Sequence, residues 1–190
     1  MNRDIKEGLK LHNLKVQNQP LDIGDYENCS FTGCDFTDAD LSYLNFIECE
    51  FVECNLSLTK LAKTSFRDVK FISCKLLGLH FDDCNNLMLS FSFDRCTLDL
   101  CSFNRLKLKK TIFRESKLPE ADFTETDLSF SSFFKCDLDR TIFRNTILES
   151  TDFRSSFNYS IDPDMNHIKK AKFSSTGLSG LLEKYDIEID

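Results

Sequence analysis

Phenylalanine or leucine occupies every fifth position over most of this chain. One run of these positions, here called centres, extends from Phe31 to Phe81, and a second extends from Phe93 to Phe153. The two runs contain 24 centres, and 20 of them follow a Cys, Ala, Ser, Thr or Val two residues earlier, here called the small position. The other three positions of each unit are mostly polar or charged. The chain therefore repeats a five-residue unit with two positions suited to burial and three suited to solvent.

The period of five excludes the two common regular structures. An α-helix repeats its buried face every 3.6 residues and a flat strand every two, so neither keeps each fifth residue inside. A chain that turns a corner after each five-residue unit keeps every fifth residue inside. Four such units then close a coil of about 20 residues. Coils stacked at strand spacing form a solenoid. The 24 centres thus predict an all-β solenoid with four sides and about six coils.

Residues 20 apart are expected to stack in neighbouring coils and to form ladders of like side chains. Four ladders are predicted. The first consists of Phe31, Phe51, Phe71 and Phe91, the second of Phe93, Phe113, Phe133 and Phe153, the third of Phe103, Phe123 and Phe143, and the fourth of Leu98, Leu118 and Leu138. Identical rings stacked in this way would fill the interior at close-packed density with one repeated geometry.

This pattern resembles the pentapeptide-repeat family, and the resemblance covers Tyr26 to Phe153. It implies a right-handed quadrilateral β-helix. We expect a degenerate N-terminal cap at residues 1–25, the β-helix at 26–160, and a capping or dimerisation segment at 161–190. The two runs of centres are out of step by two residues, so a register break is expected within residues 82–92, near Asn85 and Asn86. Either a simple bulge or a functional loop fits that break.

The C-terminal segment has a different apolar pattern. Leu178, Leu181, Leu182 and Tyr185 fall at i, i+3, i+4 and i+7, which predicts a short amphipathic helix with Thr176 available as its cap. Ile187 and Ile189 alternate with acidic residues, which predicts a terminal strand. These six apolar residues are predicted to form a homodimer at the C-terminal end. The alternative is a helix that folds back over its own chain.

All nine cysteines occupy the small position. They are Cys29, Cys34, Cys49, Cys54, Cys74, Cys84, Cys96, Cys101 and Cys136. That shared position predicts buried, slowly reacting thiols, and their intervals do not match a zinc site. We predict no catalytic, cofactor-binding or metal-binding residues, because no nucleophile, phosphate-loop or metal-site motif is found in the sequence. The expected protein is therefore not an enzyme.

Charge limits the classes of partner. The chain has 31 acidic and 24 basic residues, a formal net charge of −7. That balance argues against direct binding to nucleic acid or to an anionic membrane. No apolar run reaches the ~18 residues that a membrane span requires, and the charged start predicts no secretory signal. The expected localisation is cytoplasmic.

The acidity is uneven along the chain. Residues 26–91 contain 10 acidic and 5 basic residues, whereas residues 92–160 contain 11 of each. Residues 20 apart should stack as opposite charges, for example Glu50 with Lys70 and Glu120 with Arg140, and such exposed pairs stabilise by only ~0.2–1 kcal/mol each. The unpaired surplus lies in the first half. Its candidate partner-binding residues are Glu48, stacked on Asp68, together with Asp82 and Asp83.

Within the family, this chain is similar to the Qnr-type quinolone-resistance and MfpA-type proteins. The resemblance extends to the segments Ile161–Phe173 and Leu181–Ile187. Those proteins form acidic rod-shaped homodimers that mimic duplex DNA and bind type II topoisomerases. The resemblance therefore implies DNA gyrase or topoisomerase IV as the partner. The competing hypothesis is a generic protein–protein interaction scaffold, marked by the apolar residues Phe130 and Phe134 outside the core.

Overall fold

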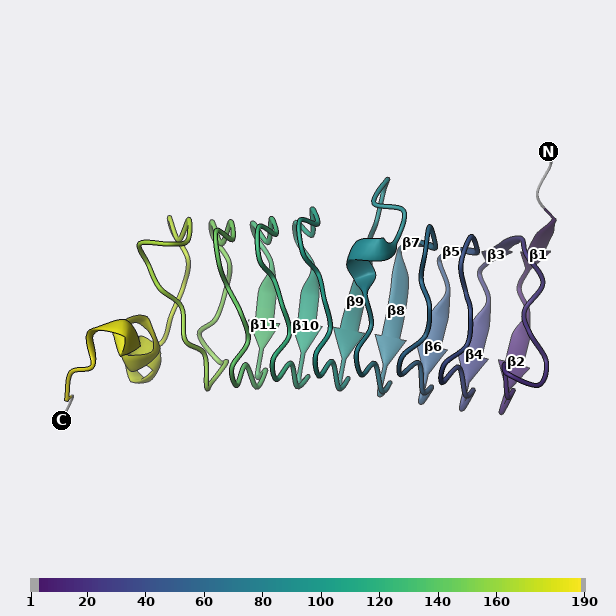
Figure 1. Cartoon of the computed structure of the whole chain (residues 1–190), viewed down its shortest axis with the longest axis horizontal. Coiled ribbons are helices and arrows are strands. Elements are labelled where there is room, and N and C mark those ends of the chain that lie inside the picture. The colour runs from purple at the N-terminus through teal and green to yellow at the C-terminus, as the bar shows by residue number, and fades with distance from the viewer. Residues whose placement is uncertain (1–3, 189–190) are drawn as a thin grey trace.

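The computed structural model describes residues 4–188 as a four-sided parallel β-solenoid of about six regular turns, with a short helical segment at its C-terminal end (Figure 1). Most backbone pairs join residues 20 apart in parallel, as in Tyr26 with Phe46 and Phe113 with Phe133. Strands define two of the four sides, and isolated bridges such as Asp35 with Asn55 define the others. The all-β solenoid predicted from the five-residue period is confirmed.

The strands form two sheets on separate sides of the solenoid. The smaller sheet has the order β1-β3-β5-β7, and its strands are β1 (Ile5–Glu7), β3 (Asp25–Glu27), β5 (Asn45–Ile47) and β7 (Ser65–Arg67). The larger sheet has the order β2-β4-β6-β8-β9-β10-β11. Its strands are β2 (Lys10–His12), β4 (Ser30–Thr32), β6 (Glu50–Val52), β8 (Val69–Ile72), β9 (Phe91–Asp94), β10 (Ile112–Arg114) and β11 (Ser132–Phe134).

All 24 centres and all 24 small positions are buried. Rings within a ladder stack face to face, as in Phe103 and Phe123, whose centroids lie 4.7 Å apart at an interplanar angle of 2°. Rings of neighbouring ladders meet edge to face, as in Phe113 and Phe123, at 5.8 Å and 89°. Both arrangements are favoured by the charge distribution of aromatic rings. The core is thus one stack of repeated contacts along the whole solenoid.

The small position also joins the coils through hydrogen bonds. The Thr126 hydroxyl donates to the Phe103 carbonyl, 23 residues earlier, at 2.7 Å, and the Thr146 hydroxyl donates to the Phe123 carbonyl at 2.9 Å. The Cys54 thiol donates in the same way to the Phe31 carbonyl at 3.3 Å. The small position therefore contributes a donor to the next coil as well as filling space.

The register break lies where it was expected. The 3₁₀ helix η1 (Phe81–Asp83) is followed by a protruding loop (Figure 1). Across this loop, β8 pairs with residues 22 positions later in β9 instead of 20. Phe91 lies opposite Val69 in a small position, and the ring of Phe71 stacks on that of Phe93 with their centroids 5.3 Å apart. The predicted stacking of Phe91 on Phe71 is wrong, because the two extra residues shift Phe91 out of the centre.

The N-terminal residues continue the solenoid as a less regular coil. Strands β1 and β2 pair with β3 and β4. Val16 is buried, and Leu11, Leu14 and Leu21 are partly buried against the core. The terminal coil thus closes one end of the apolar interior incompletely, as expected for an end unit.

The short C-terminal helix predicted from the apolar spacing is confirmed, and it consists of two 3₁₀ helices, η2 (Ser175–Leu181) and η3 (Glu183–Tyr185). Two details of the prediction are wrong. Ser174 precedes η2 without a side-chain capping bond, so the expected cap at Thr176 is wrong. Asp186–Glu188 form no strand. Ile189 lies outside the described residues. No helix among residues 4–188 has the length and apolar character to span a membrane.

Candidate partner-binding surfaces

Acidic residues of the first half are largely left without cationic partners. Within residues 26–91, all described, the one ion pair between a lysine or arginine and a carboxylate joins Lys70 to Glu50 at 2.8 Å. In the second half, such pairs recur from turn to turn, for example Arg105 with Glu125 at 2.9 Å and Arg140 with Glu120 at 2.9 Å. The acidic surplus of the first half is therefore also a surplus of unneutralised surface charge.

Several of the first-half carboxylates are held ionised by turn geometry. The Asp35 carboxylate accepts hydrogen bonds from the hydroxyl and the backbone N–H of Thr37, and these bonds hold the pKa of Asp35 below its usual value. Hydrogen bonds from the Ser42 side chain and backbone lower the pKa of Asp40 in the same way. These acids therefore serve the corners of the solenoid and add fixed negative charge to its surface.

One corner of the solenoid carries three residues singled out by sequence, Glu48, Asp68 and Phe130, together with Lys110. Glu48, Asp68, Lys110 and Phe130 each lie one or two residues before a strand of the larger sheet, and all four have positive φ, between 52° and 62°. Glu48 and Asp68 are exposed on adjacent turns, where the Glu48 N–H donates to the Arg67 carbonyl at 2.8 Å. The predicted stacking of Glu48 and Asp68 on neighbouring coils is confirmed.

The other predicted acids lie across the smaller sheet from this corner. Asp82 and Asp83 are exposed in the first turn of η1. The Asp83 carbonyl accepts the N–H of Lys63 at 2.9 Å, and Lys63 precedes β7 on the side opposite Asp68. The two groups of acids therefore lie at opposite ends of the strands of the smaller sheet and do not form one cluster.

An apolar patch covers the C-terminal half of the larger sheet. Phe134 lies in β11 and is 42% exposed, Phe130 at the preceding corner is 61% exposed, and Ile112 in β10 is 54% exposed. The Lys135 ammonium lies 5.3 Å from the Phe134 ring centroid. Ile112 was not singled out by sequence. The sequence feature that could have identified it is an isoleucine at the outward position directly before a centre, which is polar in most other five-residue units.

A groove adjoins this patch at the register break, and we call it the junction groove. It encloses about 360 Å³ between the protruding loop and the next turn. Its residues are Asp68, Val69, Lys70, Leu89, Ser90, Phe91, Ser92, Lys109, Lys110 and Thr111. The tip of the loop, Leu87 and Met88, is strongly exposed. The sequence located the break but gave no sign of the groove, because the groove depends on where the two extra residues are accommodated.

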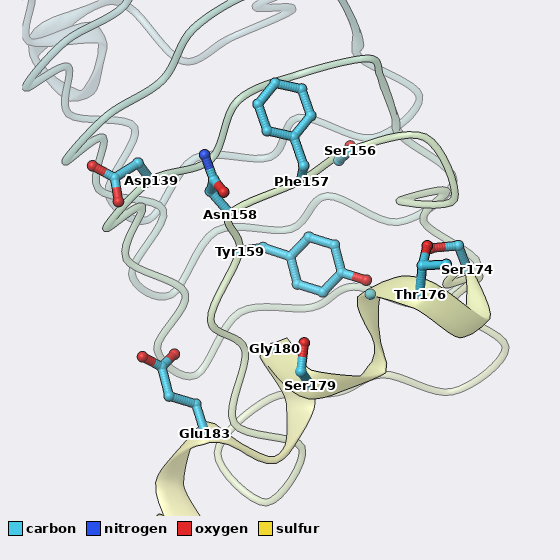
Figure 2. Close-up of a pocket in the computed structure, with 11 residues that line it drawn as sticks. Asp139, Ser156, Phe157, Asn158, Tyr159, Ser174, Thr176, Ser179, Gly180 and Glu183 are labelled. Atoms are coloured by element: carbon cyan, nitrogen blue, oxygen red, sulfur yellow. The ribbon is translucent and has the colours of Figure 1, made fainter. Parts of the chain in front are cut away.

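A polar cavity of about 530 Å³ separates the C-terminal helices from the last coil (Figure 2). Tyr159 lies within it, and its buried hydroxyl has no hydrogen-bond partner among the described residues. A Cβ at Gly177 would lie 2.1 Å from that hydroxyl, so only glycine permits this close approach. Burial raises the pKa of Tyr159.

The residues predicted for dimerisation differ in their exposure to solvent. Leu181 packs against the core of its own chain, and Leu182 is half-buried. Leu178, Tyr185 and Ile187 are exposed. Lys184 fastens η3 to the last coil through ion pairs with Asp162, at 2.6 Å, and with Asp164. The segment therefore folds back over its own chain and still presents apolar side chains to solvent.

The cysteines lie in the core of the solenoid. All nine are free and buried. Burial raises the pKa of Cys101 to about 12 and that of Cys136 to about 12, which disfavours the reactive thiolate. Among residues 4–188, no group of His, Cys, Asp and Glu side chains is arranged to hold a metal ion.

Comparison with known proteins identifies the family. The family described as the pentapeptide repeat region matches residues 25–99, and the family of pentapeptide repeats (8 copies) matches residues 121–156. The chain therefore belongs to the pentapeptide-repeat proteins. Comparison with curated proteins gives no match.

Solved structures resemble the whole chain. Full-length QnrB1, a plasmid-mediated fluoroquinolone resistance protein, matches with a TM-score of 0.63 and 20% identity, covering 97% of this chain and 100% of QnrB1. A trypsin-treated QnrB1 variant matches with a TM-score of 0.64 and 20% identity, covering 97% of this chain and 99% of its own. At this identity the likeness shows the fold: a Qnr-like pentapeptide-repeat solenoid.

Proposed function

We propose that this protein is a non-enzymatic, cytoplasmic binding protein whose acidic half binds a type II topoisomerase, DNA gyrase or topoisomerase IV, and protects it from quinolones. The observation that carries the proposal is the unneutralised acidic surface of residues 26–91 on a rod-shaped solenoid. The likeness in fold to QnrB1, a fluoroquinolone resistance protein, supports the choice of partner.

The charge density indicates how closely the rod can mimic DNA. Residues 26–91 make about three turns at ~4.8 Å each, so their net charge of −5 gives roughly one charge per 3 Å. Duplex DNA carries one charge per about 1.7 Å of axis. The first half thus reaches about half the linear charge of DNA, and residues 92–160 are neutral. Mimicry is therefore confined to the first half, and like charge disfavours direct binding of this half to nucleic acid.

The test is a gyrase supercoiling assay with and without ciprofloxacin, together with a binding measurement on the isolated topoisomerase. We expect the full chain to bind and to restore supercoiling in the presence of the drug. Glu48→Lys should weaken binding, whereas Glu149→Lys, the same change at an exposed acid in the neutral half, should leave it nearly unchanged. Equal binding by both variants would reject the acidic half as the partner surface.

A second candidate function is a scaffold for an unrelated protein partner. The exposed patch of Ile112, Phe130 and Phe134 favours it, because grouped apolar side chains on a charged rod mark interaction surfaces. The double variant Phe130→Ser/Phe134→Ser separates the two functions. The variant should still bind the topoisomerase if the acidic half is the contact surface. It should lose binding to its protein partner if the apolar patch is the contact surface.

We also propose a homodimer at the C-terminal end, in which Leu178, Tyr185 and Ile187 of two copies meet. The support is that these side chains are exposed although the segment that carries them already covers the end of the solenoid. Closed twofold pairing is the most common arrangement of homo-oligomers.

A further inference from the structure

The junction groove combines lysines, an apolar base and an unpaired backbone carbonyl. We propose that it binds the acidic, alternating segment Asp186-Ile187-Glu188-Ile189-Asp190 of a second copy of this chain, in an extended conformation. This interaction is independent of the proposed topoisomerase function, and it differs from the end-to-end dimer in the surface that the tail contacts.

Of the three lysines of the groove, two form ion pairs and one does not form any with the described residues. Lys70 pairs with Glu50 at 2.8 Å, and Lys109 pairs with Asp127 at 3.2 Å. Lys110 is exposed and pairs with no carboxylate among residues 4–188. The one acid of the groove, Asp68, already accepts a hydrogen bond from Ser90 at 2.7 Å. An incoming acidic segment would therefore find one lysine, Lys110, that is free to form a new ion pair.

The register break also leaves a backbone acceptor open. One turn further on, the Lys110 N–H donates to the Ser129 carbonyl at 3.0 Å, as the repeat requires. The equivalent donor to the Lys109 carbonyl would be Ser90, but the Ser90 N–H donates to Phe66 at 2.9 Å instead. Within residues 4–188 the Lys109 carbonyl has no donor. An extended peptide could supply one, as in recognition by strand addition.

Apolar side chains lie beside these polar groups. Leu89 is partly buried in the groove, and Leu87 and Met88 rise from the loop next to it. On the other side, Ile112 and Phe130 extend the apolar surface along the larger sheet. The groove therefore offers an apolar base with lysines at its edge.

The C-terminal tail has the complementary pattern. In an extended chain, successive side chains point to opposite sides, so Ile187 and Ile189 would lie on one side and the three acids on the other. The apolar side would contact Leu89 and Ile112, and the acids would face Lys109 and Lys110. In this structure Asp186–Glu188 form no regular element and are exposed.

The tail of the same chain does not reach its own groove. Between the level of β9 and the C-terminal cap, the rings of Phe93, Phe113, Phe133, Phe153 and Phe173 are stacked in steps of 4.6 to 5.4 Å. Four such steps exceed the ~17 Å that five extended residues can span. Lys184 also fastens the start of the tail to Asp162 at the far end. The tail must therefore come from a second copy.

The experiment titrates a fluorescent peptide of residues 183–190 with the full chain at low salt and follows anisotropy. We expect saturable binding that weakens at least tenfold with Lys109→Glu/Lys110→Glu. The control is Lys169→Glu/Lys170→Glu, which reverses an exposed lysine pair at the same two positions of the unit, 60 residues later. A peptide in which lysine replaces Asp186, Glu188 and Asp190 should bind Lys109→Glu/Lys110→Glu more tightly than it binds the native chain.

Two results would overturn the proposal: no saturable binding, or equal binding by the native chain and both double variants. Thermal unfolding verifies that the variants are folded, and Lys110→Ala provides a milder second variant. Sedimentation of the full chain separates this contact from the end-to-end dimer. Self-association that persists in Lys109→Glu/Lys110→Glu belongs to the end-to-end dimer, whereas self-association lost in this variant belongs to the tail–groove contact.

Discussion

At the scale of single residues, each small position combines space filling with donation of a hydrogen bond to the neighbouring coil. Threonine, serine and cysteine alternate in this role, as Thr126, Ser131 and Cys54 show through their bonds to carbonyls 23 residues earlier. The sequence predicted that these positions are buried, because they keep a fixed offset from the centres. It did not predict the bonds, which depend on where the carbonyls of the next coil point.

The centres should dominate stability. Phe123→Ala leaves a cavity in a ladder whose rings stack on Phe103 and Phe143, and we expect it to lower the free energy of unfolding by ~3–5 kcal/mol. Cys136→Ser should cost much less, because Ser116 and Ser156 occupy the same slot on adjacent turns and donate to backbone carbonyls there. Urea denaturation measures both. Equal costs would contradict the distinction between centre and small position.

The thiols should react slowly in the native protein. All nine thiols are buried, and burial raises the pKa of Cys49 to about 12 and that of Cys136 to about 12, so the thiolates of these two residues are scarce at neutral pH. We expect Ellman's reagent to modify the nine cysteines only as fast as the chain unfolds, with a rate that rises in urea. Several thiols that react within seconds in buffer would show that the core opens locally.

At the scale of elements, the sequence predicted the regular coils of the solenoid better than its C-terminal segment. The five-residue period determined which residues face inward, and the two-residue offset located the break, because both follow from spacing alone. The short C-terminal helix was predicted, but its 3₁₀ form was not, because Gly177 and Gly180 allow η2 to pack directly on Tyr159, a tertiary contact that apolar periodicity does not contain. The sequence also singled out Asp82 and Asp83, but these acids lie in η1, on the other side of the smaller sheet from Glu48 and Asp68.

The cap formed by η2 and η3 should be sensitive to acid. Lys184 hydrogen-bonds to Asp162 and lowers its pKa below the ordinary value of 3.8. A carboxylate whose folded pKa is depressed stabilises the cap above its unfolded pKa and loses that contribution as the pH falls through the folded value. We therefore expect the cap to loosen below about pH 3.8.

The Ile161 amide reports this change, because its N–H donates to the Gly180 carbonyl at 2.8 Å. Its NMR shift should titrate in the native chain, and in Lys184→Ala it should already resemble the loosened state at neutral pH. Arg154→Ala is the matched control, since it removes an ion pair with Asp152 outside the cap. An unchanged Ile161 shift in Lys184→Ala would show that packing alone holds the cap.

At the scale of the whole molecule, charge and closure of the ends determine what the rod can bind. The acidic half and the C-terminal cap lie at different levels of the rod (Figure 1), and the junction groove shares Asp68 with the acidic half. The repeat predicted the rod itself. Its partners depend on outward positions, where the repeat places few constraints on residue type.

The last prediction concerns assembly of two rods at the C-terminal end. Deletion of residues 178–190 removes the exposed Leu178, Tyr185 and Ile187 and also uncovers Tyr159 and the last coil. An uncovered end of a solenoid exposes apolar core and open strand edges, so we expect the deletion to give monomer or aggregate where the full chain gives a dimer. The milder Leu178→Ser/Tyr185→Ser keeps Leu181 and the Lys184 ion pairs, and it should give a folded monomer. Light scattering at micromolar concentration distinguishes these states, and a monomeric full chain would reject the end-to-end dimer.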